Sequence, residues 1–410
     1  MTPKANQDIK YLIISTLQNK IFIGLNKARK DFIISVLWHF LSIKGRINFL
    51  QLGRFSPYCE QTHRIQFEKE FDFFAFNRLL TEEIVSKDCI IAFDPSYIPK
   101  SGKLTYGSGR FWSGSAKAAK LGLEIGGFAV VDVEHNTAFH LKAWQTPGFD
   151  KPDAGQFNLL SHYASLVTEN AKAFKEISKY LVADAYFSKK PFVDSVLKSG
   201  LHFISRLRDD SVLMYKYSGK PTGKKGRPKK YGDRIMVNDL DTKYFEKVVC
   251  DEDLTVYSAL VYSKAFQRDI NLAVAVFYKD GQEVARKLFF STNLQQEGTQ
   301  IVSYYRSRFQ IEFLYRDAKQ HTGLNHCQAR SENKLDFHFN ASLTAVNLAK
   351  YDWLSSESSE RTPFSMANHK TYYNNALMLE RFISRFAINP NSTKNRKIVK
   401  ELLELGRIAA

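Results

Sequence analysis

The sequence predicts a mixed α/β fold with helical regions at both ends of the chain. Apolar residues between positions 32 and 41 recur at helical spacing, and residues 1–85 as a whole have a helical pattern. From residue 89 onward, three strand-like runs are followed by alternating helix and strand patterns up to residue 207. This succession is typical of a sheet that combines antiparallel and parallel strands.

Two of the predicted strands end at an aspartate. The apolar run at residues 89–93 stops at Asp94-Pro95, and because proline cannot continue a central strand, we expect Asp94 at its carboxyl end. A second apolar run, residues 180–183, ends at Asp184. Further strands are predicted at residues 121–133, 137–144 and 201–207, with helices within residues 155–180 and at 190–198.

Residues 208–286 interrupt the alternation and predict a β-rich insertion. They begin with a basic, Gly/Pro-rich stretch and continue with alternating segments. The sheet pattern resumes at residues 287–291, and a long helix is expected from about residue 296 to residue 319. The predicted domains are a helical N-terminal domain, a core in two pieces, the insertion and a helical C-terminal region, bounded as 1–85, 86–207 with 287–335, 208–286, and 336–410.

The chain is strongly basic. Lys and Arg total 59 against 42 acidic residues, a formal net charge of +17. Such an excess favours a polyanionic partner, of which nucleic acid is the commonest and an anionic membrane surface the rival. Composition alone leaves open a basic enzyme of small-molecule metabolism.

Neither membrane insertion nor disulfide bonding is expected. The sequence has no run of 18 apolar residues, and its first ten residues lack the apolar centre of a signal peptide. The four cysteines are scattered and form no CxxC pair, which is typical of reduced thiols and argues against a zinc ribbon. These features predict a cytoplasmic protein.

The predicted long helix carries one polar stripe. Tyr305, Arg308, Glu312 and Lys319 fall within roughly 60° of one another on a helical wheel, and Arg316 lies close to the same stripe. A glutamate there can hold a divalent cation while its basic neighbours clamp phosphates. The alternative is an exposed face with an Arg308–Glu312 ion pair, worth only a few tenths of a kcal/mol.

Asp94 and Asp184 supplement the glutamate. Sites in α/β sheets collect at the carboxyl ends of strands, where both aspartates are predicted. Together with Glu312 they form an all-oxygen set suited to Mg²⁺, with Mn²⁺ as a substitute. Each aspartate alone is more often a strand-end cap, and Asp132, which also ends an apolar strand, is a rival core carboxylate.

The stripe has the spacing Tyr-x2-Arg-x3-Glu-x6-Lys and resembles the Tyr-Arg-Glu-Lys signature of DDE insertion-sequence transposases. The segments around Asp94 and Asp184 resemble the first and second aspartate regions of that family. These segments are Ile91-Ala92-Phe93-Asp94, followed by Pro99-Lys100-Ser101-Gly102, and Leu181-Val182-Ala183-Asp184-Ala185-Tyr186-Phe187. The likeness runs from about residue 90 to residue 325.

The resemblance implies a ribonuclease-H-like catalytic core with a β-rich insertion. The helix, short Gly-containing turn and helix within residues 1–85 are compatible with a DNA-binding domain and equally with an ordinary helical bundle. The resemblance implies that Asp94, Asp184 and Glu312 are the catalytic metal ligands, and that the basic residues and the tyrosine of the stripe contact DNA. It also implies cut-and-paste transposition: cleavage at terminal inverted repeats, joining to target DNA, and two protomers in a synaptic complex associated with the nucleoid.

Two further segments are candidates for DNA contact. The first carries Lys224, Lys225, Arg227, Lys229 and Lys230 on a Gly/Pro-rich backbone that can enter a minor groove. The second follows Asp94 and contains Lys100 and Lys103, with Trp112 available to stack on a base. The alternatives are a solvated loop for the first segment and a packing role for Trp112.

Two other functions remain open from the sequence. A ribonuclease-H-like nuclease would cut DNA without joining it to a target. A DNA-binding protein derived from a transposase would bind without cutting, although the presence of all three carboxylates argues against it.

Overall fold

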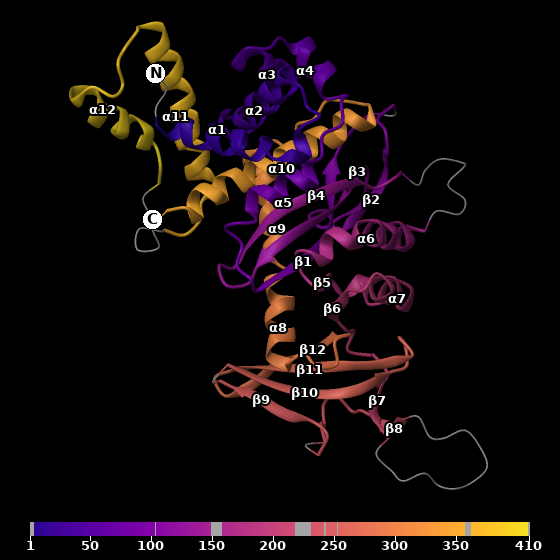
Figure 1. The fold of residues 1–410 in the computed structure, drawn as a ribbon. Helices are drawn as coiled ribbons and strands as arrows, with labels where there is room; N and C mark the ends of the chain where they lie inside the picture. Colours follow the sequence, from indigo (N-terminus) through magenta and orange to yellow (C-terminus); the bar gives the residue numbers. More distant parts are fainter. Residues whose placement is uncertain are drawn as a thin grey trace.

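The computed structural model describes residues 4–102, 104–148, 158–217, 231–241, 243–251, 253–356 and 362–408. Within these residues, twelve strands form one sheet in the order β2-β3-β1-β5-β6-β12-β11-β10-β7-β8, with β4 paired to β3 and β9 paired to β10. Parallel pairs, β1 with β5 and β5 with β6, lie among antiparallel ones, and helices flank the sheet (Figure 1). The predicted mixed α/β fold is therefore confirmed.

The core part of the sheet is covered by helices on both faces. Helices α6 (Leu159–Lys175) and α7 (Lys190–Lys198) cover one face, where Phe93 and Phe128 pack with Phe174. Alternate residues of the same strands, such as Ala92, pack on the other face against the N-terminal and C-terminal helices. The strands of this part are β1 (Cys89–Pro99), β2 (Gly109–Ser113), β3 (Ala118–Asp132), β4 (Thr137–Gln145), β5 (Tyr180–Val182) and β6 (His202–Arg206).

The insertion extends this sheet and lies at the lower end of Figure 1. Its last strand pairs with β6, where Phe290 lies opposite Ser205, and this pairing joins the insertion to the core. The strands are β7 (Leu213–Lys216), β8 (Tyr231–Arg234), β9 (Glu246–Cys250), β10 (Leu254–Ser263), β11 (Arg268–Lys279) and β12 (Gln282–Ser291). The β-rich content predicted for this region is thus present.

Helix α10 (Glu332–Leu354) links the helical regions to the sheet. It is buried on nearly all sides and packs against both α2 and β4. Two buried asparagines fix it on β4: Asn340 exchanges hydrogen bonds with the backbone of Ala143, and Asn347 with that of His140. The N-terminal helices are α1 (Lys4–Leu17), α2 (Lys27–Ser42), α3 (Phe49–Phe55), α4 (Glu60–Gln66) and α5 (Phe73–Thr81).

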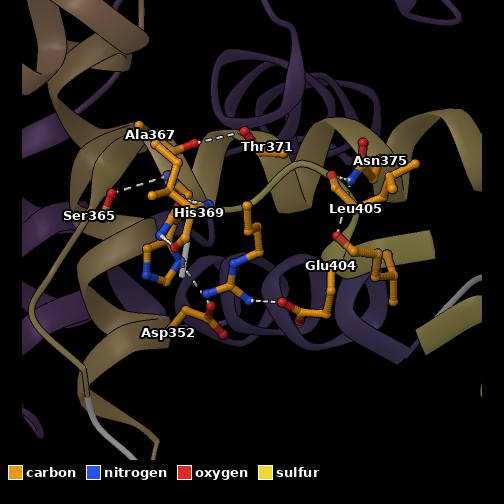
Figure 2. A network of polar contacts seen from close by, with 12 residues as sticks. Asp352, Ser365, Ala367, His369, Thr371, Asn375, Glu404 and Leu405 are labelled. Carbon is orange, nitrogen blue, oxygen red and sulfur yellow. Dashed lines mark hydrogen bonds and ion pairs between the residues drawn. The ribbon is translucent and has the colours of Figure 1, made fainter. Parts of the chain in front are cut away.

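Two helices, α11 (Met366–Arg385) and α12 (Thr393–Glu404), complete the chain. Polar contacts tie the residues after α12 to α11 (Figure 2): Asn375 donates to the carbonyl of Leu405, and Asn368 donates to that of Ile408. An ion pair between Asp352 and His369 joins α10 to α11. In the described chain, no helix combines the length and apolar character needed to cross a membrane.

Strand β1 does not end at Asp94, and that prediction is wrong. The strand continues through Pro95 to Pro99, paired with β3. Its parallel neighbour β5 pairs with it only as far as Ala92, so one edge of β1 is open at Pro95. On that open edge no neighbouring strand needs a hydrogen bond from residue 95, so the strand tolerates a proline, which has no N–H to donate.

The predicted long helix is also wrong, because it is two helices, α8 (Gly298–Ser307) and α9 (Gln310–His321). Between them the backbone forms hydrogen bonds that span three residues instead of four: the N–H of Phe309 donates to the carbonyl of Arg306, and that of Glu312 to the carbonyl of Phe309. Helix α8 packs on β6 and the insertion strands, whereas α9 packs on β1, β3 and β4. The break lets each helix follow its own part of the sheet.

Candidate active site

Asp94 lies on β1, and Asp184 lies just after the end of the neighbouring parallel strand β5. Ala92 of β1 lies opposite Val182 of β5, and the two aspartates follow these residues by two positions. Because side chains alternate along an extended chain, both carboxylates leave the sheet on the same face as Ala92 and Val182. Neighbouring strands are about 4.8 Å apart, so the two side chains begin close together.

Glu312 reaches the same place from the first turn of α9, which crosses β1 at Asp94. The hydroxyl of Tyr315 donates to the backbone carbonyl of Asp94 at 2.7 Å. One turn further along, the ammonium of Lys319 donates to the hydroxyl of Ser96 at 2.8 Å. These two bonds fix α9 over the end of the β1–β5 pair.

The close approach of α9 to the sheet depends on Gly127, which lies opposite Asp94 in the β1–β3 register. A Cβ atom added at Gly127 would lie 2.0 Å from the hydroxyl oxygen of Tyr315. No other residue type would fit here without moving the Tyr315 side chain or the helix that carries it.

Arg308 joins two of the three carboxylates. Its guanidinium lies 2.9 Å from Glu312 Oε1 and 3.4 Å from Asp94 Oδ1, and its side chain is only 9% exposed. Burial lowers the pKa of this group, but attraction to Asp94, Tyr305 and Glu312 outweighs burial and raises it. Arg308 is therefore a permanent cation at the centre of the acidic residues.

The carboxylates repel one another and are partly removed from water. Burial raises the pKa of Asp94 to about 7; Arg308 opposes this rise, and repulsion from Glu312 and Asp184 adds to it. Burial also raises the pKa of Asp184, against the hydrogen bond from the N–H of Tyr186 and the attraction of Arg308. Mutual repulsion of this kind is relieved when a cation binds.

The donor chemistry of this site suits a hard divalent cation, since all three acidic residues offer only oxygen. In the part of the chain that the structure describes, however, no group of three or more Asp, Glu, His or Cys side chains is close enough to form a metal cluster. The guanidinium of Arg308 lies between Asp94 and Glu312 and is bonded to both of them.

Asp132, the rival carboxylate, lies away from this group. It pairs with Cys89 at the opposite end of β1 and is fully buried. Burial acts to raise its pKa, but hydrogen bonds from His135 and Ser86 outweigh burial and lower it. Asp132 closes the β3–β4 turn and has no place in the site.

The remaining residues of the predicted stripe line the site or its margin. Tyr305 is half-buried, and its ring centroid lies 4.8 Å from that of Phe289. The guanidinium of Arg308 lies over the ring of Tyr305. Arg316 is more exposed and lies over the ring of Phe313. The stripe thus survives the break between α8 and α9.

Two basic residues near the site were not predicted. Burial raises the pKa of Asp184, and attraction to Lys189 is one of the contributions that oppose this rise. The ammonium of Lys189 lies 3.9 Å from the ring centre of Tyr186. Burial raises the pKa of Tyr305, and the positive charge of Arg206, at the end of β6, opposes this rise. The position of Lys189, five residues after Asp184, was the available sequence signal, whereas Arg206 becomes a neighbour only when the sheet forms.

The other predicted DNA contacts are placed only in part. Lys100 donates its ammonium to the carbonyl of Cys327 at 2.6 Å and is half-buried. Trp112 is 64% exposed on the edge strand β2, so a packing role is excluded for it. Lys103 and the segment with Lys224, Lys225, Arg227, Lys229 and Lys230 lie outside the described residues.

Two family models match the chain. Residues 163–348 match the model described as a transposase DDE domain, and residues 75–248 match the model of a DDE superfamily endonuclease. These matches support a transposase or endonuclease of the DDE superfamily. The second range contains Asp94 and Asp184, and the first contains Asp184 and Glu312. No curated protein sequence matches the chain.

The likeness to the DDE superfamily carries three expectations. It suggests nuclease-type catalysis, it implies a DNA substrate, and it is generally accompanied by divalent metal ions. Within the matched ranges, Arg308 lies among the three carboxylates, and the ammonium of Lys319 lies beside Asp94.

Proposed function

We propose that the chain is a transposase that cleaves DNA at terminal inverted repeats and joins the freed ends to a target by a cut-and-paste route. The observation that best supports this function is the placement of Asp94 on β1 and of Asp184 just after the adjacent parallel strand β5, near Glu312 of α9. The descriptions of the two matching families, transposase and endonuclease, agree with the same reaction class.

In this proposal Asp94, Asp184 and Glu312 hold Mg²⁺, or Mn²⁺ in its place. Held by these carboxylates, a pair of such ions would supply Lewis-acid stabilisation of the attacking and leaving oxygens in an in-line displacement. The same three carboxylates serve both steps, the hydrolytic nick and the attack of the freed 3′-hydroxyl on target DNA.

The surrounding side chains bind and orient the DNA. Arg308 and Lys319 supply positive charge beside the carboxylates, where the phosphates flanking the scissile bond would lie. Burial raises the pKa of Tyr305, although Arg308 opposes it, so the hydroxyl keeps its proton and can donate to a phosphate oxygen. Arg316 extends the positive surface toward solvent.

Three further features belong to the proposal. The domain boundaries 1–85, 86–207 with 287–335, 208–286 and 336–410 would separate DNA binding, catalysis, the insertion and the C-terminal region. The segment with Lys224, Lys225, Arg227, Lys229 and Lys230, together with Lys100 and Lys103, would add DNA contacts. Two protomers would hold two element ends in one synaptic complex.

The test replaces the glutamate and compares binding with cleavage. We expect Glu312→Gln to abolish Mg²⁺-dependent nicking of supercoiled plasmid and to leave duplex binding unchanged, because the amide cannot replace a carboxylate ligand. Glu401→Gln is the matched control, since Glu401 is exposed on α12, and should nick like the wild type. Nicking by Glu312→Gln at the wild-type rate would refute the catalytic assignment.

Joining separates a transposase from a nuclease. The wild-type protein is incubated with target plasmid and a duplex that carries the inverted repeats flanking the coding sequence. Covalently joined product is expected; cleavage without joined product would favour the nuclease instead.

A further inference from the structure

A basic pocket of about 670 Å³ lies at the carboxyl end of α9, at the other end of that helix from Glu312. The connection between α2 and α3 contributes Lys44 and Arg46 to its wall. His321 and His326 come from the end of α9 and the loop that follows, and Lys370 comes from the first turns of α11. Three segments far apart in the sequence therefore bring cationic or titratable groups to one cavity.

The part of this pocket's lining that the structure describes carries no negative charge to offset its basic residues. None of the described residues that line it is acidic. Lys44 and Arg46 are exposed, and within the described chain their side chains have no ion-pair partner. Lys370 is buried at the floor, where its ammonium donates to the carbonyl of Phe40 at 2.6 Å. Burial holds the pKa of Lys370 well below its usual range, and a bound anion would raise that pKa again.

His326 is oriented as a donor. The backbone N–H of Ile47 donates to its Nδ1 at 3.1 Å, so the neutral ring carries its proton on Nε2. Burial lowers the pKa of His326, and the positive charges of Arg46 and Lys370 lower it further. Burial also lowers the pKa of His321. Attraction to Asp317 opposes this, and repulsion from Lys370 and Arg316 adds to it.

The carboxyl ends of two helices disfavour an anion here, but their partial negative charges are smaller than the full positive charges of Lys44 and Arg46. Helices α2 and α9 both end near the pocket, and each carboxyl end carries roughly half a negative unit charge. Lys370 already donates a hydrogen bond to one carbonyl in the last turn of α2, that of Phe40. The full charges of Lys44 and Arg46 therefore leave the pocket positive.

We propose that this pocket binds a backbone phosphate of the DNA substrate, a role that rests on the proposed function. His321 lies nine residues beyond Glu312 on α9, about 13–14 Å along the helix axis. At 3.4 Å per base pair, this distance corresponds to about four base pairs if the DNA follows the helix. Arg316 and Lys319 lie between the two points along the sequence of α9 and add positive charge on the side of the carboxylates.

The experiment measures binding of a short duplex to the full-length protein in EDTA across a series of salt concentrations. Because no cleavage occurs in EDTA, the result does not depend on whether the protein is catalytically active. Each phosphate contact contributes about 0.9 to the slope of log affinity against log salt concentration. We expect Lys44→Ala/Arg46→Ala to reduce this slope by about 0.9–1.8.

The matched control is Lys397→Ala/Lys400→Ala, which removes two exposed charges on α12 and should change the slope far less. Arg46→Lys should retain most of the slope, because it keeps the charge. A reduction no larger than that of the control would overturn the proposal.

A second arm distinguishes DNA from other anions. Inorganic phosphate and polyglutamate are titrated into the wild type and into Lys44→Ala/Arg46→Ala. If the variant loses affinity for either of these anions but binds the duplex with the wild-type slope, the pocket serves that anion and the DNA assignment is overturned.

Discussion

Replacing Gly127 by alanine tests the contact that places Glu312 over the aspartates. The added Cβ would lie 2.0 Å from the Tyr315 hydroxyl oxygen and 3.0 Å from the carbon that bears it. The Tyr315 side chain, or the helix that carries it, must move, and the hydrogen bond from Tyr315 to the carbonyl of Asp94 is lost. Overpacking costs about 1–3 kcal/mol and the lost bond about 1 kcal/mol, so we expect a loss of about 2–4 kcal/mol.

A double-mutant cycle isolates that contact. Tyr315→Phe removes the hydroxyl and should cost about 1 kcal/mol by itself. Combined with Gly127→Ala, it also removes the shortest overlap and the shared hydrogen bond, so the double variant should lose less stability than the sum of the single losses. The assays are urea denaturation and Mg²⁺-dependent plasmid nicking, and nicking should fall in Gly127→Ala because Glu312 moves with α9. Additive stability losses, or a Gly127→Ala protein as stable and as active as the wild type, would refute this reasoning.

Two more predictions concern the charges at the site. Arg308→Gln should destabilise the metal-free protein by about 1–3 kcal/mol, because Asp94 and Glu312 lose their shared cation. In urea denaturation, Mg²⁺ should restore more stability to this variant than to the wild type, whereas Arg316→Gln should change by less than about 0.5 kcal/mol. The pKa of Asp94 is raised to about 7 in the folded protein, so the unfolded chain ionises first and metal-free stability should fall as pH rises from about 4 to about 7. Asp94→Asn should remove part of that fall, and identical pH profiles for variant and wild type would contradict the assigned pKa.

The sequence predicted the acidic residues better than the elements that carry them. Asp94 and Asp184 were predicted from apolar runs that stop at an aspartate, and the structure places both beside the same parallel pair. The expected end of β1 was wrong because Pro95 was judged as a residue of a central strand. Whether a strand still has two neighbours at a given residue depends on where β5 ends, and the local sequence does not contain that information.

The contacts that position α9 were beyond reach for a similar reason. Gly126-Gly127 within a strand pattern indicates that something approaches the backbone closely. Only the packed structure identifies the ring of Tyr315 as what approaches Gly127, because Tyr315 is 188 residues further along the chain. The spacing of the stripe, in contrast, is local, and it could be predicted although its helix is broken.

The break between α8 and α9 gives the insertion a physical connection to the site. Helix α8 is packed so closely on the insertion that a Cβ atom added at Gly298 would lie 2.7 Å from Cβ of Ser258 on β10. Arg308 follows directly after α8, and its side chain is bonded to Asp94 on β1 and to Glu312 on α9. A displacement of the insertion strands would therefore move Arg308 relative to the carboxylates. Since Arg308 is bonded to two of those carboxylates, the position of the insertion bears directly on how Asp94 and Glu312 are held.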